Sequence, residues 1–164
     1  GCMISCDIHE NKWKRIRAGA ERLGLSCIST RTMDARRPDA DLLGTMDVVL
    51  ADVPCSGLGV IRKKPEIRFK DPAALSQLPA IQRDILEGLA PCVRPGGVLV
   101  YSTCTVLPEE NQEIIHVFLS RHPEFRRETF TLPGPVGLCD GEATLWPQRL
   151  GTDGFYICRM RRKA

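Results

Sequence analysis

The sequence predicts an α/β fold built on a mostly parallel sheet, and three observations lead to this expectation. Apolar strand-like runs alternate with helical stretches over the first three quarters of the chain. Two of these runs, 47–51 and 97–105, lead into reactive side chains, as strands of a parallel sheet often do at their carboxyl ends. After residue 125 the helical pattern gives way to short β-like pieces, which usually add an antiparallel edge to such a sheet.

The N-terminal part is expected to form a strand, a helix and a second strand. A short strand over 1–7 precedes an amphipathic helix over 10–23, and Gly24 suits the left-handed residue that ends many helices. The next strand is expected over 26–30. The apolar face of the helix has residues that recur every three or four positions: Trp13, Ile16, Ala20 and Leu23. We therefore interpret Trp13 as a core residue.

Two apolar strands are expected to deliver a thiol each to one edge of the sheet. The run 47–51 is bounded by turn residues, which fits a strand that is covered on both faces. It ends on Asp52 and continues into a loop that contains Cys55. The strand over 97–105 has Cys104 near its end. Side chains in these places face the crevice where open α/β sheets bind ligands.

The remaining elements are helices and a terminal β pair. The segment 71–93 is predicted to be mainly helical, with Pro79 in a first helical turn. A turn is expected over 94–97, between this helical segment and the next strand, and another helix is expected to begin at Pro108. The buried stripe of the long helical segment is expected to comprise Ile81, Ile85, Leu86, Leu89 and Val93. The terminal β pair is expected at 125–130 and 154–160.

Composition narrows the class of protein. At 164 residues and 18.2 kDa, the chain is expected to form a single domain, 1–164. No apolar run reaches the length of a membrane span and the N-terminus has no signal-like pattern, which predicts a cytoplasmic protein. The eight cysteines include no C-x-x-C pair and the histidines have no ligand spacing, so we predict no metal site. Six of the eight cysteines are interpreted as buried, reduced thiols.

Acidic residues follow three successive strands of the predicted sheet. Asp7, Asp34 and Asp52 stand at or shortly after the strand ends. An acid after the strand that precedes the first helix commonly binds the ribose hydroxyls of a nucleotide cofactor. A single aspartate in such a place is often only a helix cap or a turn former. Three of them favour a shared ligand.

A basic run follows the Cys55 loop. Its five cations lie within nine residues, whereas the net charge of the chain is only +3. Such a run either contacts phosphates or forms a solvated loop. Phe69, inside the run, suits base stacking or local packing equally well. The cations are Arg62, Lys63, Lys64, Arg68 and Lys70.

The two cysteine motifs together resemble those of a known family. The run DVPCSGLG at 52–59 and the run YSTCTVLPEEN at 101–111 are similar to the paired motifs of the RNA cytosine-5 methyltransferases of the Sun/Fmu (NOL1/NOP2/Sun) type. Within that group the likeness is strongest to the bacterial methyltransferases that act on small-subunit ribosomal RNA. The resemblance covers nearly the whole chain and implies a Rossmann-like class I methyltransferase fold with S-adenosylmethionine as cofactor.

The resemblance also implies roles for individual residues. Cys104 matches the nucleophile that adds to C6 of cytosine, and Cys55 matches the cysteine linked to release of the methylated RNA. Asp52 matches a residue near both cofactor and base, Asp7 the ribose-binding acid, and Asp34 the acid close to adenine. The basic run then favours contact with the RNA backbone. We further expect the helix that begins at Pro108 to lower the pKa of the Cys104 thiol.

The chain departs from the family pattern at its start. The family's glycine-rich cofactor loop, which resembles D-x-C-A-A-P-G-G-K-T, is absent from the sequence. We therefore expect a partial methyltransferase domain without the first strand, which in this fold lies between the strands that end at Asp7 and Asp52. The resulting gap weakens cofactor binding and offers a place for self-association, because unpaired strand edges are costly.

Three alternatives remain at this point. The chain is an RNA-binding remnant that has lost cofactor binding, or it belongs to an enzyme that modifies transfer RNA instead of ribosomal RNA. In the third, Cys55 and Cys104 form a redox pair. Calorimetry with S-adenosylmethionine separates the remnant from the enzyme, and mixed-disulfide chemistry would mark the redox pair.

Overall fold

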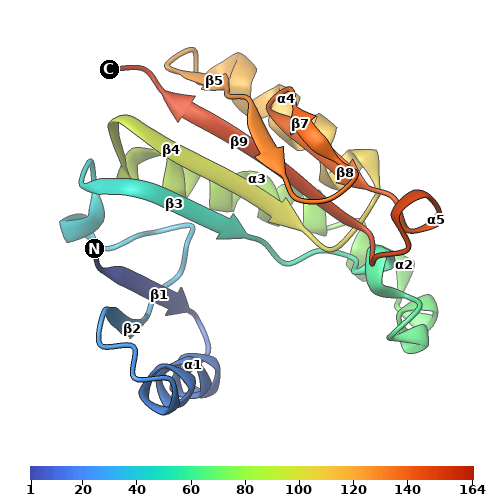
Figure 1. Ribbon diagram of the computed structural model, residues 1–164, viewed down its shortest axis with the longest axis horizontal. Helices are drawn as coiled ribbons and strands as arrows, with labels where there is room; N and C mark the ends of the chain where they lie inside the picture. The colour runs from blue at the N-terminus through green and yellow to red at the C-terminus, as the bar shows by residue number, and fades with distance from the viewer.

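A computed structural model describes residues 1–164 and shows an α/β fold with a mixed sheet (Figure 1). The main sheet has five strands in the order β3 (Met46–Asp52), β4 (Val93–Thr103), β9 (Phe155–Arg162) and β5 (Phe125–Arg127), with β8 (Glu142–Leu145) also paired to β9. The β3 and β4 strands are parallel, whereas β9 is antiparallel to β4. The predicted antiparallel addition is therefore confirmed, but β9 lies inside the sheet and not at its edge.

The hydrophobic core lies between this sheet and two helices, α3 (Leu78–Leu89) and α4 (Gln112–Arg121). Both helices run along one face of the sheet (Figure 1). Proline in the first turn of α3 and the buried stripe of Ile85, Leu86 and Leu89 agree with the sequence prediction. Fully buried partners come from β4 and α4, among them Leu99 and Ile114.

The N-terminal elements form a small unit with a sheet of its own. Strands β1 (Met3–Asp7) and β2 (Ile28–Thr32) make a two-stranded parallel sheet, and α1 (Glu10–Arg22) packs on it. This unit lies apart from β3, so neither β1 nor β3 is paired across the intervening edge (Figure 1). Gly24 has the expected left-handed conformation after α1, and β2 begins two residues later than predicted.

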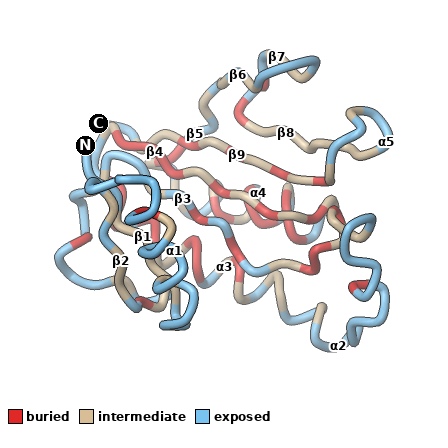
Figure 2. The backbone as a smooth tube through the Cα atoms, turned by 60° about the horizontal axis from the view of Figure 1, so that its bottom comes forward, coloured by how far each residue is buried: buried red, intermediate tan, exposed pale blue.

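The apolar face of α1 is less buried than the sequence indicates. Ile16 and Leu23 are exposed, and Ala20 is the buried residue of the helix. Trp13 is only half-buried, so its assignment to the core is wrong; its indole N–H donates to Thr32 Oγ1 at 2.8 Å. The physical reason is that a two-stranded sheet covers only part of one helix face. Figure 2 colours most residues of this unit as exposed or intermediate.

Strand β3 is also buried on one face only. Val49 and Ala51 face the core, whereas Val48 and Leu50 are 59% and 65% exposed. The prediction of a strand covered on both faces is therefore wrong. Helix α3 contacts one face of β3, and the side chains of the other face are largely exposed.

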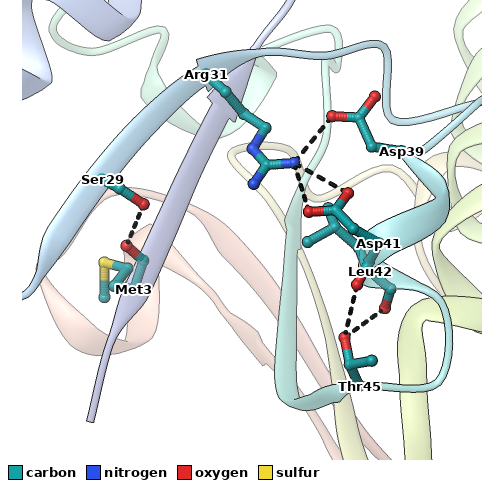
Figure 3. Close-up of polar contacts among 7 residues, drawn as sticks. All are labelled: Met3, Ser29, Arg31, Asp39, Asp41, Leu42 and Thr45. Carbon is teal, nitrogen blue, oxygen red and sulfur yellow. Dashed lines mark hydrogen bonds and ion pairs between the residues drawn. The ribbon is translucent and has the colours of Figure 1, made fainter.

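An ionic contact connects the N-terminal unit to the segment that leads into β3. One guanidinium nitrogen of Arg31, in β2, donates to Asp39 at 3.0 Å and to Asp41 at 3.1 Å (Figure 3). Asp41 belongs to the 3₁₀ helix Ala40–Leu42, whose Leu42 is buried in the main core. Ile4 and Cys6 of β1 also pack against the main core, so apolar contacts and this ion pair join the two parts where strand pairing does not.

Short elements complete the chain. The expected turn over 94–97 is instead a bulge inside β4, where the register to β3 shifts and Gly96 has a φ of 74°. Helix α2 (Pro72–Leu75) precedes α3, and β6 (Phe130–Leu132) pairs with β7 (Gly137–Cys139). The remaining 3₁₀ helices are Leu58–Val60, Pro65–Phe69, Ala90–Cys92 and Pro108–Glu110, and α5 spans Pro147–Leu150.

All eight cysteines are free thiols, and three of the six not assigned to chemistry are buried. Cys2 and Cys27 are exposed, contrary to the expectation of burial, because they lie in the open N-terminal unit. None of the helices combines the length and apolarity needed to cross a bilayer.

Candidate active site

The structure brings the two predicted cysteines together. Cys55 lies in the loop after β3 and Cys104 in the loop after β4. These strands are parallel neighbours in register, with Asp52 opposite Ser102, so the two loops start side by side. The Sγ atoms of Cys55 and Cys104 are 3.3 Å apart, which is hydrogen-bond distance for a thiol pair.

Close backbone packing fixes the Cys55 loop. The Gly59 amide donates to the Cys104 carbonyl at 3.0 Å, and the Gly154 amide donates to the Gly59 carbonyl at 2.8 Å. A Cβ atom at Gly59 would lie 2.0 Å from the Gly154 carbonyl oxygen, so only glycine fits there. The loop is thus held between the Cys104 loop and the segment that leads into β9.

Buried polar side chains that the sequence analysis did not single out lie under the cysteines. The carboxylate of Glu110 accepts from the Ser56 amide at 2.9 Å and from the Gln82 amide group at 2.8 Å. Asn111 and Thr103 form a second buried contact at 2.6 Å. A sequence signal for Gln82 existed, because it is a polar residue on the apolar stripe of a helix. For Glu110 and Asn111 the only sequence signal was their position in the family-like motif at 101–111.

The electrostatics of the pair make Cys104 the acidic thiol. The hydrogen bond from Cys55 lowers the pKa of Cys104 to about 6; burial and the charge of Asp52 oppose this, while the Lys70 charge assists it. The pKa of Cys55 is raised by its hydrogen bond to Cys104 and by burial. The predicted direction for Cys104 is correct, but its main cause is the second thiol and not the helix that follows Pro108.

The strand-end acids occupy two parts of the molecule. Asp52 lies beside Cys104 and accepts from the Ser102 hydroxyl at 2.9 Å through one oxygen, which leaves the other without a protein partner. Asp7 lies at the end of β1, where it accepts from the His9 amide at 2.8 Å and pairs with Lys12 at 3.4 Å. Carboxylates of this kind suit the hydroxyl groups of a ribose.

Asp34 is strongly engaged by a neighbour. The Arg36 side chain donates to both oxygens of Asp34, and these hydrogen bonds, with one from the Arg36 amide, lower the pKa of Asp34 to about 2. It lines a cavity of about 600 Å³ whose other walls are Arg36, Arg37, Asp84, Glu87 and Gly88. This lining offers hydrogen bonds but no hydrophobic side chain to pack on an adenine ring.

The basic run lies next to the Cys55 loop, and its members have different surroundings. Lys70 donates to the Ser56 carbonyl at 2.8 Å and therefore faces the cysteines. Lys63 and Arg62 pair with Asp153 at 2.5 and 3.6 Å. Arg68 donates to the Pro65 carbonyl at 3.1 Å, and Lys64 makes no ion pair. Phe69 is 82% exposed, which excludes a core role.

The fold and the site define a class. A mixed α/β sheet carries an acid and two thiols at the carboxyl ends of adjacent parallel strands, where open α/β sheets bind ligands. The chain superposes on a solved methyltransferase homolog protein from Pyrococcus horikoshii with a TM-score of 0.77 at 25% identity, over 99% of this chain and 53% of that one, so the fold is class I methyltransferase-like. No group of three metal-ligating side chains exists in the structure. The family model described as 16S rRNA methyltransferase RsmB/F matches residues 1–161. The chain belongs to this family of ribosomal RNA 5-methylcytosine methyltransferases.

Relatives and solved structures agree with the assignment. The chain is 44% identical over 170 residues to the probable ribosomal RNA small subunit methyltransferase B of Bacillus subtilis (strain 168), a match that covers 99% of this chain and 38% of the relative. The crystal structure of PH0851 superposes with a TM-score of 0.88 at 33% identity, over 99% of this chain and 37% of that one.

The structure of NSun6 from Pyrococcus horikoshii with SFG gives a TM-score of 0.78 at 26% identity, over 100% of this chain and 42% of that one. The chain thus spans about two fifths of the length of the curated relatives that it matches.

Proposed function

We propose that this chain carries the methyl-transfer centre of an enzyme that makes 5-methylcytosine in small-subunit ribosomal RNA. The observation that carries the proposal is the cysteine pair, whose Sγ atoms are 3.3 Å apart and whose Cys104 member has a pKa of about 6. A thiol of this acidity is mostly thiolate at neutral pH, which is the nucleophilic form. Family membership supports the choice of reaction and of RNA.

The chemistry needs a nucleophile because cytosine C5 reacts poorly with a sulfonium methyl group. The Cys104 thiolate adds to C6, which forms a sulfur–carbon bond and moves the π electrons toward C5. When bound, S-adenosylmethionine supplies the electrophilic methyl group that C5 takes. Loss of the C5 proton to a base then re-forms the C5–C6 double bond and releases the Cys104 thiolate.

Cys55 serves the release step in this proposal. Its thiol donates to Cys104, so it stabilises the same thiolate that leaves C6 at the end of the cycle. Asp52 lies beside Cys104 with one free oxygen and is placed to contact the base or the cofactor.

The cofactor would be held at the carboxyl ends of β1 and β3. Asp7 and Asp52 have the chemistry for its hydroxyl and amine groups, and Asp34 would contact adenine only if Arg36 gave up part of its pairing. The free edges of β1 and β3 are where the family's first strand, or a second copy of the chain, would pair.

The RNA would approach over the basic run. Reaching C6 of a stacked base requires the nucleotide to be unpaired or turned out of its helix. Arg62, Lys63, Lys64 and Arg68 would follow the backbone, and the exposed Phe69 ring would stack on a base. Lys70 differs from them because it faces the cysteines.

Trapping on RNA that contains 5-fluorocytosine tests the proposal, since fluorine at C5 cannot leave as a proton. The protein is the parent-length enzyme with this chain in place, incubated with S-adenosylmethionine. Cys104→Ala should abolish the covalent adduct, whereas Cys55→Ala should accumulate an adduct even on ordinary RNA. An adduct formed by Cys104→Ala would overturn the assignment of the nucleophile.

The RNA-binding remnant is the second candidate, and the basic run beside the Cys55 loop favours it, because RNA contact there needs no cofactor. Calorimetry of the 164-residue chain with S-adenosylmethionine separates the two. Measurable heat of binding supports the enzyme. No heat, together with retained RNA binding that weakens steeply with salt, supports the remnant.

A redox pair also fits the distance between the two thiols. It predicts that a mild oxidant closes a Cys55–Cys104 disulfide and that a small thiol reductant reopens it through a mixed disulfide. Absence of the mixed disulfide in mass spectra removes this candidate.

A further inference from the structure

Glu110 is a buried charged group that the proposed chemistry does not use. The residue is 2% exposed, and one of its carboxylate oxygens, Oε1, has no hydrogen-bond partner. The Oε1 oxygen of the neighbouring Gln82 is equally unpartnered. Burying such groups without full pairing costs stability, and an apolar pair would cost less. The arrangement therefore needs an explanation other than the stability of the core.

The two residues hold the peptide groups on either side of Cys55. Glu110 Oε2 accepts from the backbone amide of Ser56 at 2.9 Å. Gln82 Nε2 donates to the backbone carbonyl of Pro54 at 3.0 Å and to Glu110 Oε2 at 2.8 Å. Each peptide that flanks Cys55 is thus fixed by a buried side chain from outside the loop, which sets the direction of the Cα–Cβ bond of Cys55.

The same network is attached to the Cys104 side. The Tyr101 hydroxyl donates to the Glu110 backbone carbonyl at 2.6 Å, and the Ser56 hydroxyl contacts the Thr105 hydroxyl at 2.9 Å. Tyr101 lies in β4, three residues before Cys104, and Thr105 follows Cys104 directly in the loop after β4. Glu110 consequently connects the two cysteine loops, although neither thiol touches it.

We propose that Glu110, acting with Gln82, is a positioning residue that holds the Cys55 thiol against Cys104 so that the pair works as one donor and one nucleophile. The inference rests on the proposed function only for the claim that the cysteine pair serves methyl transfer. The geometry itself is a property of the free chain.

The acidity of Cys104 reports this alignment. Three charged or titratable groups face Cys104. Asp52 ends β3, Cys55 lies in the loop after β3, and Lys70 directly follows Phe69. The Cys55 hydrogen bond is the largest of these influences. A change at Glu110 leaves Asp52 in place and acts on Cys104 through the Cys55 loop.

The experiment is the pH dependence of iodoacetamide labelling at Cys104, followed by peptide mapping on the 164-residue chain. The wild-type midpoint is expected near the pKa of about 6. Glu110→Ala should move it toward the ordinary thiol value and slow labelling at neutral pH by about tenfold or more. Glu109→Ala is the matched control, because this neighbouring exposed acid makes no contact with the loop.

Two further variants separate positioning from simple loss of folding. Glu110→Gln keeps a carbonyl acceptor for the Ser56 amide and should retain the wild-type midpoint; a midpoint shifted as in Glu110→Ala would contradict the role of that acceptor. Gln82→Met keeps the volume and removes the Pro54 contact, so it should shift the midpoint in the same direction as Glu110→Ala. An unchanged midpoint in folded Glu110→Ala or Gln82→Met protein overturns the proposal.

Labelling needs neither RNA nor cofactor, so it is independent of the trapping experiment. A shifted midpoint in Glu110→Ala together with a failure of Cys104 to trap RNA would remove the proposed function and leave the positioning role intact.

Discussion

At the scale of single residues, Lys70 is expected to affect the pKa of Cys104, whereas the other cations of the basic run are expected to contact RNA. Lys70 donates to the Ser56 carbonyl and its charge lowers the pKa of Cys104. Lys70→Met should therefore raise the labelling midpoint of Cys104, by less than Cys55→Ala does, because the Cys55 hydrogen bond is the larger cause. Lys64→Met is the control, since Lys64 makes no ion pair and should leave the midpoint unchanged. Equal midpoints for wild type and Lys70→Met would exclude this influence.

Gly59 gives the second prediction at this scale. A Cβ at Gly59 would overlap the Gly154 carbonyl at 2.0 Å, whereas one at Gly19 in α1 would meet nothing within 4 Å. Gly59→Ala is therefore expected to destabilise the fold by roughly 1–3 kcal/mol. Gly19→Ala should stabilise it by about 0.5–1 kcal/mol, because alanine is the better helix former. Urea unfolding monitored by circular dichroism measures both, and a neutral Gly59→Ala would contradict the close approach.

At the scale of elements, a histidine connects α3, α4 and β5. The ring nitrogens of His122 contact Glu87 at 2.7 Å and Glu124 at 3.0 Å, and the ring stacks on Phe118. Burial acts to lower the pKa of His122, but the hydrogen bonds to Glu124 and Glu87 outweigh it and raise the pKa. Burial likewise acts to raise the pKa of Glu124, and its hydrogen bond to His122 outweighs this and lowers it.

These shifts set a pH window for stability. The folded pKa of His122 lies above its ordinary value of 6.5, so its contribution is full below that value and is lost as pH rises through the folded pKa. The contribution of Glu124 is present above about 4.5 and is lost as pH falls through its lowered pKa. His122→Gln should therefore cost on the order of 0.2–1 kcal/mol near pH 5.5 and less near pH 8.5. Urea midpoints at both pH values test this; an equal cost at both would contradict it.

The elements also show which parts of the structure the sequence could supply. Apolar periodicity located α1, α3 and α4, and the proline and glycine signals located the start of α3 and the end of α1. Periodicity could not say how much of each face is covered, because coverage depends on neighbours that no local pattern names. Val48 and Leu50 are an example: they lie in an apolar run typical of a buried strand, yet they are exposed because their face of β3 is left uncovered.

At the scale of the whole molecule, the site depends on contacts between segments far apart in the chain. The motifs placed Cys55 and Cys104 at one sheet edge, and the structure brings them there. The contacts that support the two loops could be found only from the structure, because their residues are distant in sequence. Gln82 comes from α3 and Gly154 from the segment before β9. Local sequence rules give no reason for a buried glutamine to serve a loop 28 positions away.

The two parts of the molecule differ in how completely they are packed. The main sheet and its two helices contain the core, whereas the N-terminal unit keeps its strands apart from β3 and exposes much of its apolar surface. The acids that would hold the cofactor are divided between these parts. The cysteine pair lies wholly on the packed part, so its chemistry can be examined without the cofactor.

The central claim is that two thiols from the loops after adjacent parallel strands form one site in which Cys104 is the reactive member. Its most direct test is the labelling of both cysteines with iodoacetamide in the wild-type chain between about pH 5 and about pH 9, read out by mass spectrometry of the two peptides. The account predicts a midpoint near 6 for Cys104 and little labelling of Cys55 over the same range. Equal labelling of the two cysteines, with both midpoints at the ordinary thiol value, would contradict it.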